Sequence, residues 1–152
     1  MLGRVLGRVR RQEGADIEVE ETAVEIIDLA VVEGMFDQIG TEHAIQLVEQ
    51  SFVDFDAQIR RLHEGASSQN WPDCLSALHG MKGIAVDWGA IALTDAVVAA
   101  KQALLNHDID GLATILLSLV DLQRKTRSAL LVHLAKCAAV WVAKARPNGL
   151  PH

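Results

Sequence analysis

The stretch from 77 to 90, ALHGMKGIAVDWGA, contains the residue types in this chain that are best suited to chemistry. His79 is followed by Lys82 three residues later and by Gly83 four residues later. On a helix these positions lie on one face. A neutral imidazole can act as a nucleophile and form a covalent intermediate, and a neighbouring ammonium can offset the negative charge of a phosphoryl group. The stretch is therefore a candidate nucleophilic site, and if the electrophile is a phosphoryl group, Lys82 would supply part of the charge neutralisation.

Helical geometry predicts that this histidine lies outside the core. At about 100° per residue, His79 falls roughly 150° from the centre of the apolar sector of its helix. That sector consists of Cys74, Ala77, Leu78, Met81, Ile84, Ala85 and Trp88. The alternative to a functional site is an ordinary solvated helix face that happens to contain a histidine and a lysine.

The glycine beside the histidine favours the functional interpretation. A glycine inside a helix costs about 0.5–1 kcal/mol relative to alanine, and nothing in the local helix needs Gly83. Its bare backbone would let another protein come close to the ring of His79. Apolar residues around the ring suggest a contact surface. The docking surface that we expect consists of Trp71, Leu75, Ser76 and Val86.

Helical periodicity runs through most of the chain, and strand signals are weak. Two helix starts are marked by capping residues: Thr22 with Glu25 as a capping box, and Asn70 as an N-cap. Two helix ends are marked by Gly65, which precedes the loop GASSQN, and by Pro147 after the last helix. The expected helices span residues 22–39, 41–64, 70–88, 90–105 and 109–145. Short loops between them favour an all-α fold, an antiparallel up-down four-helix bundle with an additional N-terminal helix.

Charge divides the chain into an arm and a body. The chain has 152 residues and a net charge of −6. The four arginines within residues 1–11 carry +4, so the remainder carries −10. An acidic body argues against nucleic acid as the main partner. We expect a basic, mobile arm at 1–20 (alternatively a short amphipathic surface helix), a helical bundle at 21–146 and a flexible tail at 147–152.

The composition also bears on location. No apolar run reaches the roughly 18–20 residues of a membrane span, and the N-terminus is a poor signal peptide. The two cysteines, Cys74 and Cys137, lie in helical patterns without metal-like spacing and are expected to be buried, reduced thiols. These features predict a cytoplasmic protein.

The sequence LHGMKGIAVDWGA resembles the signature of the histidine-phosphotransfer (HPt) domain family, approximately A-H-x-L-K-G-S-x-x-x-x-G-A. The resemblance covers roughly residues 28–132 and implies a four-helix bundle. The positions that match are His79, Lys82, Gly83, Gly89 and Ala90. The positions that depart from it are Leu78, Gly80, Met81 and Ile84.

By this resemblance, His79 is the phospho-acceptor and Lys82 helps hold the phosphoryl group. Many family members have a polar residue, often Gln, 22 residues after the histidine, where this chain has Lys101 followed by Gln102. The family carries phosphate between receiver-domain aspartates, so the implied partners are response-regulator receiver domains and a hybrid sensor kinase. The chain would be a phosphocarrier rather than a self-sufficient enzyme, without a cofactor of its own, and the receiver would supply Mg²⁺. The alternative is a helical interaction module that docks receivers or kinases without carrying phosphate.

The other histidines are expected to be structural or solvated, and no metal site is expected. His133 lies in the last helix with no partner at the spacing of a metal site, and the Glu-x-x-His pairs of a di-iron bundle are missing. That helix is longer than a four-helix bundle needs, and the additional length is its end, residues 130–145. We expect it to pack on the first helix or to form a subunit contact.

Overall fold

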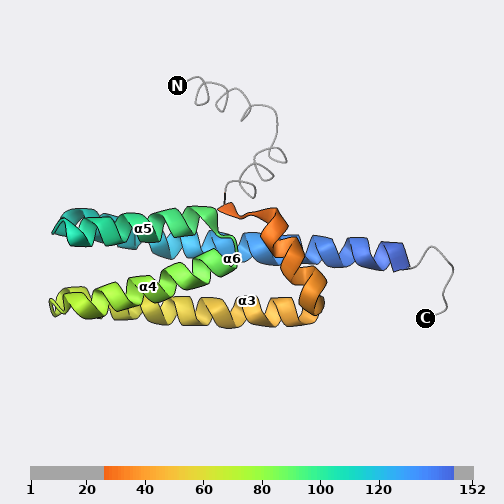
Figure 1. Cartoon of the computed structure of the whole chain (residues 1–152), viewed down its shortest axis with the longest axis horizontal. Coiled ribbons are helices and arrows are strands. Elements are labelled where there is room, and N and C mark those ends of the chain that lie inside the picture. Colours follow the sequence, from red (N-terminus) through yellow and green to blue (C-terminus); the bar gives the residue numbers. More distant parts are fainter. Residues whose placement is uncertain (1–25, 146–152) are drawn as a thin grey trace, which may run out of the picture.

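The computed structural model describes residues 26–145 and is all-helical in this range (Figure 1). The helices are α3 (Leu29–Ser67), α4 (Trp71–Asp87), α5 (Ile91–Leu105) and α6 (Ile109–Ala145). The predicted all-α class is confirmed, and the bounds of the last three helices agree with the sequence prediction to within a residue or two. The expected arm at 1–20, the capping box at 22–25 and the tail at 147–152 lie outside the described residues.

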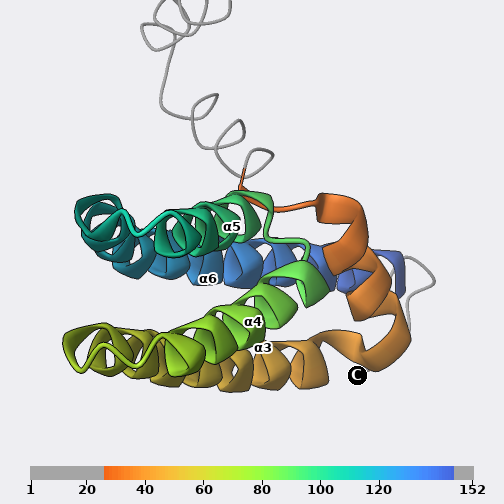
Figure 2. The same ribbon diagram turned by 60° about the vertical axis from the view of Figure 1, so that its left-hand side comes forward.

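Each helix packs against two others. The contacting pairs are α3 with α4, α4 with α5, α5 with α6, and α6 with α3, which closes a ring around one core. Successive helices run in opposite directions (Figure 2). Turns of three residues, at 68–70, 88–90 and 106–108, join them, and connections this short place consecutive helices side by side.

Helix α3 is broken at Gly40. This glycine has φ 80° and ψ 169°, a conformation that side chains other than hydrogen rarely allow. The segment before it, residues 29–39, turns away from the rest of α3 and crosses α6 (Figure 2). The sequence places a helix boundary at this glycine, and the break confirms it.

The first helical segment that the sequence predicts is interrupted within the described residues. Residues Ile27 and Asp28 are not helical, and Asp28 is the N-cap of α3, where its carboxylate accepts a hydrogen bond of 3.1 Å from the backbone N–H of Ala30. The expectation of a continuous helix from Thr22 to Ile39 is therefore wrong. An aspartate near the start of an apolar pattern is itself a strong N-cap signal.

Gly65 does not end a helix, contrary to the prediction. Helix α3 continues to Ser67, and Gly65 is buried inside it. A Cβ at this position would lie 2.9 Å from the Cys74 sulfur, so the glycine allows α4 to approach α3 closely. Asn70 does cap α4 as predicted, because its side chain accepts a hydrogen bond of 3.3 Å from the backbone N–H of Asp73.

The core holds the apolar residues that the helical pattern predicts for α4. Cys74, Ala77, Leu78, Met81, Ala85 and Trp88 are buried, and Ile84 is half-buried. The Trp88 indole donates a hydrogen bond of 3.0 Å to the Ser51 hydroxyl across the core. Burial raises the pKa of the Cys74 thiol, and the charge of Asp73 raises it further, so this cysteine stays a neutral, packed thiol.

Gly89 is required by the turn between α4 and α5. It has φ +62°, and a Cβ would lie 2.9 Å from the Cβ of Val31 and 3.1 Å from that of Asp28. Its carbonyl accepts a hydrogen bond of 2.7 Å from the Asp28 backbone N–H. We expect Gly89→Ala to lower the free energy of unfolding by about 2–4 kcal/mol, through the left-handed backbone and the overpacked contact together. The free energy of unfolding is measured by urea titration, with unfolding monitored by circular dichroism.

Gly83→Ala is the matched control, because it makes the same change where a Cβ meets nothing within 4 Å. It should raise the free energy of unfolding by about 0.5–1 kcal/mol. A Gly89→Ala protein as stable as the wild type would contradict this explanation of the turn.

Candidate functional site

The histidine singled out by the sequence lies on the surface. His79 is exposed on α4, as are Lys82 and Gly83 one turn further along. The preceding residue, Leu78, is buried, so the core holds the helix and fixes the direction in which the ring leaves it. The start of α4 is tied to α3 by Arg61, whose Nε and Nη2 donate to the Asp73 carboxylate at 2.8 and 2.6 Å.

The two glycines of the motif differ in what surrounds them. Gly89 lies in a tight turn with a positive φ, as described above. Gly83 lies in the middle of a helix turn on the surface, and a Cβ there would meet no atom within 4 Å. Internal packing explains Gly89 and leaves Gly83 unexplained. A helical glycine that costs stability and makes no internal contact leaves open space beside His79.

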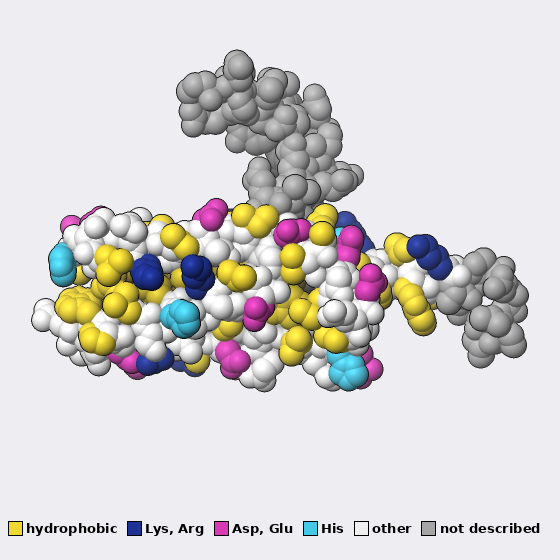
Figure 3. Space-filling view, viewed as in Figure 1, with side chains coloured by type: hydrophobic (Ala, Val, Ile, Leu, Met, Phe, Trp, Pro, Cys, Tyr) yellow, Lys and Arg dark blue, Asp and Glu magenta, His cyan; other side chains and the backbone are white. Residues whose placement is uncertain are grey.

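Positive charge gathers on the same face. Lys82 is the basic residue of α4 and Lys101 that of α5, and both are exposed. Figure 3 shows two Lys or Arg side chains close to a histidine over these two helices, next to a group of hydrophobic side chains. Within residues 26–145, neither lysine forms an ion pair with a carboxylate. Their charges therefore remain available to an anionic group on this face.

The expected docking residues divide into two groups. Ser76 is exposed, and Val86 is exposed over 53% of its surface, more than most apolar residues described. Trp71 and Leu75 are half-buried and pack against the core cluster. The parts of the predicted surface that a partner would reach most readily are thus Ser76 and Val86, on either side of His79 along the helix.

The sequence interpretation missed the role of Gly80, beside His79. A Cβ at Gly80 would lie 3.3–3.6 Å from three side-chain atoms of Gln58, so the glycine makes room for this side chain of α3. The Oε1 atom of Gln58 is buried and has no hydrogen-bond partner in the described part of the chain. The departure of Gly80 from the HPt-like signature is therefore linked to a polar side chain packed behind the histidine.

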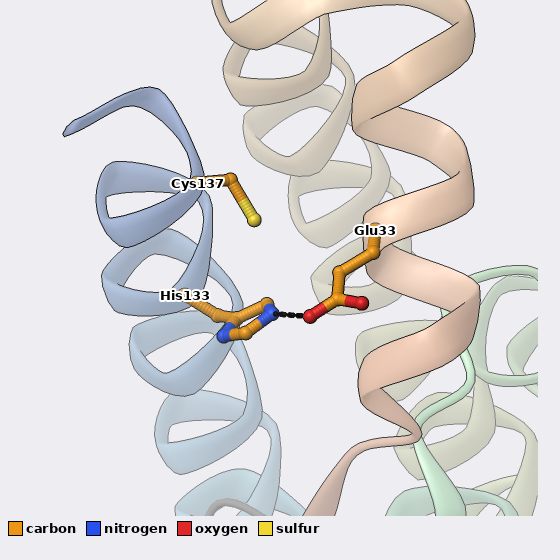
Figure 4. Close-up of side chains that lie close together, drawn as sticks. All are labelled: Glu33, His133 and Cys137. Atoms are coloured by element: carbon orange, nitrogen blue, oxygen red, sulfur yellow. Dashed lines mark hydrogen bonds and ion pairs between the residues drawn. The ribbon is translucent and has the colours of Figure 1, made fainter. Parts of the chain in front are cut away.

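A second cluster of reactive side chains lies away from His79. The His133 Nε2 is 3.2 Å from the Glu33 carboxylate, and Cys137 lies one helical turn beyond His133 (Figure 4). The possible ligand atoms of these three residues all lie within 4.8 Å of one another. The expectation that His133 has no partner at the spacing of a metal site is wrong, because Cys137 and Glu33 both lie beside it. The His133/Cys137 spacing of four was a usable signal, whereas Glu33 is 100 residues away in sequence.

Cys137 is half-buried rather than fully buried, unlike Cys74. Burial raises the pKa of the Cys137 thiol, and the nearby negative charges of Glu33 and Asp37 raise it further. The contact of His133 with Glu33 confirms in part that the stretch 130–145 packs on the first helical segment, one of the two arrangements expected from the sequence, whereas residues 139–144 of that stretch are exposed. Among residues 26–145, no helix combines the length and the apolar character that crossing a membrane requires.

Comparison with protein-family models, curated proteins and solved structures gave no match to this chain. Its function must therefore be inferred from its own residues. Three features of α4 bear on it: an exposed imidazole, an ammonium one turn away, and an open helical glycine beside them.

Proposed function

We propose that this chain is a histidine-containing phosphotransfer protein, an HPt-like four-helix bundle that relays a phosphoryl group through His79. Its partners are response-regulator receiver domains and a hybrid sensor kinase of a two-component system, and it works in the cytoplasm. It carries the group and needs a partner for each transfer, so it is not a complete enzyme.

The observation that carries the proposal is the open space at Gly83. The glycine weakens the helix, and apart from its chain neighbours and the backbone of its own helix no atom lies within 4 Å of the position a Cβ would take. It lies one turn from an exposed histidine, on the same face. A nucleophile must be approached in line by the phosphoryl donor, with the reacting atoms about 3–3.5 Å apart. A bare backbone beside the ring permits that approach.

The chemistry assigned to each residue is simple. A receiver aspartate carries the phosphoryl group as an acyl phosphate. An unprotonated imidazole nitrogen of His79 attacks the phosphorus, an N–P bond forms, the P–O bond to the aspartate breaks, and the carboxylate leaves with the bonding electrons. The reverse reaction loads the next receiver. Mg²⁺ belongs to the receiver, where it offsets the charge of the acyl phosphate.

The two lysines have an electrostatic role in this proposal. Most of the work in phosphoryl transfer is positioning and charge neutralisation. Lys82, one turn from His79, is the nearer cation in sequence, and Lys101 comes from the neighbouring helix α5. Both offset the charge of the phosphohistidine, and with Gln102 they form its polar surroundings.

Incubation with a phosphorylated receiver tests the proposal directly. A panel of receiver domains, loaded with acetyl phosphate and Mg²⁺, is mixed with the chain, and the products are analysed by intact-mass and peptide mass spectrometry. We expect one phosphate per chain, labile in acid and stable in base, on the peptide that contains His79. If receivers bind but no phosphate reaches the chain from any of them, the chain is an interaction module instead.

A further inference from the structure

The cluster of Glu33, His133 and Cys137 joins two parts of the chain that are far apart in sequence. Glu33 comes from the segment of α3 before the Gly40 break, and the other two come from α6, at positions four apart on one face. All three side chains point into the space between the two helices (Figure 4). His133 is well covered, with 16% of its side chain exposed. The proposed phosphotransfer function does not use this cluster.

The ligand atoms of these three residues indicate which metal ions the cluster could bind. A thiolate and an imidazole are ligands of zinc and other transition metals, whereas Mg²⁺ and Ca²⁺ are bound by oxygen atoms. Thiolate and carboxylate together carry two negative charges, which neutralise a divalent cation. Three protein ligands leave one position of a tetrahedron for water or another group.

The distances also fit a tetrahedral ion. Two ligands bound to zinc at about 2.0–2.2 Å with tetrahedral angles lie about 3.3–3.6 Å apart, and an imidazole nitrogen and a zinc-bound sulfur lie about 3.6 Å apart. The Nε2 of His133 and the Oε2 of Glu33 are separated by 3.2 Å. The sulfur of Cys137, one ring nitrogen of His133 and one carboxylate oxygen of Glu33 all lie within 4.8 Å of one another, so the sulfur has to move by about 1.2 Å at most to reach the tetrahedral separation. Rotation of one side chain provides that movement.

We propose that Glu33, His133 and Cys137 form a zinc-binding site that links the first segment of α3 to the C-terminal half of α6. Binding requires the neutral His133 ring, which coordinates through Nε2, and replaces its hydrogen bond to Glu33. The S–H bond of Cys137 breaks, its proton goes to solvent, and the sulfur lone pair forms the bond to zinc. No electron is transferred. Asp37, one turn beyond Glu33 on the same segment, is the candidate for the fourth ligand in place of water.

Cobalt titration of the full chain, kept reduced and freed of metal, tests the site. Co²⁺ replaces zinc in thiolate-containing tetrahedral sites and gives strong visible bands and a near-ultraviolet thiolate-to-cobalt band. We expect these bands to saturate at one Co²⁺ per chain and to disappear when one equivalent of Zn²⁺ is added. Zinc at about a hundred times its dissociation constant should raise the melting temperature by about 5–10 °C.

Three variants assign the ligands, and two more serve as controls. Cys137→Ser should abolish the thiolate band, and His133→Gln and Glu33→Gln should each weaken binding at least about tenfold. Cys74→Ala removes the other thiol of the chain, and His63→Gln removes an exposed histidine of α3; both should leave the cobalt spectrum unchanged. Circular dichroism verifies that each variant is folded. Absence of a thiolate band in the wild type, or its persistence in Cys137→Ser, would overturn the proposal.

Discussion

Replacing His79 by glutamine should stop phosphoryl transfer to this chain. Glutamine keeps a polar side chain of similar length but has no unprotonated nitrogen that can attack phosphorus, so the initial rate of labelling should fall at least about a thousandfold, to the background of the assay. The rate is measured by the loss of phosphate from a labelled receiver and its appearance on the chain. Because His79 is exposed, the helix content should be unchanged, and the free energy of unfolding should stay within about 0.5 kcal/mol of the wild type.

The control is the same substitution at another exposed histidine. His63→Gln lies on α3 and removes an imidazole of comparable exposure, so it should accept phosphate at the wild-type rate. Equal labelling of His79→Gln and wild type would mean that the phosphate is carried elsewhere. If His79→Gln still binds the receiver but accepts no phosphate, His79 is needed for phosphoryl transfer and not for receiver binding.

Filling the open space at Gly83 should block the approach of a partner. Gly83→Gln places a long side chain where no atom of this chain lies within 4 Å, on the face that presents His79. Receiver affinity and transfer rate should both fall, by about 10–100-fold, which corresponds to about 1.4–2.8 kcal/mol. Glutamine is a better helix former than glycine, so the variant should be slightly more stable than the wild type. Titration of a receiver by isothermal calorimetry measures the affinity.

Gly34 offers a matched control for this experiment. It is an exposed helical glycine of α3, and a Cβ there also meets nothing within 4 Å. Gly34→Gln should therefore gain helix stability in the same way while leaving receiver binding and transfer unchanged. If Gly83→Gln transfers phosphate as fast as Gly34→Gln does, the glycine has no steric role and the main support for the proposed function is lost.

Much of this fold follows from local patterns. The stripes of apolar residues fix which face of each helix is buried, so the exposed position of His79 and the burial of Leu78 and Met81 were predictable from a turn of about 100° per residue. The break at Gly40 and the cap at Asn70 were predictable as well, because backbone conformation and capping depend on residues only a few positions apart.

Contacts between distant segments were decided by the tertiary structure alone. Gly65 has the local features of a helix stop, yet its lack of a side chain serves the close packing of α3 against Cys74. Glu33 and His133 are 100 residues apart, and nothing in the periodicity of either helix specifies that they meet. The sequence places Gly89 between two helices and Gly83 inside one, but only the packed helices show that a Cβ at Gly89 would meet Val31 and Asp28, whereas a Cβ at Gly83 would meet no neighbouring group. The reason is physical: a sequence pattern records which side of a helix faces the core, whereas the partner on the other side depends on how all the helices pack together.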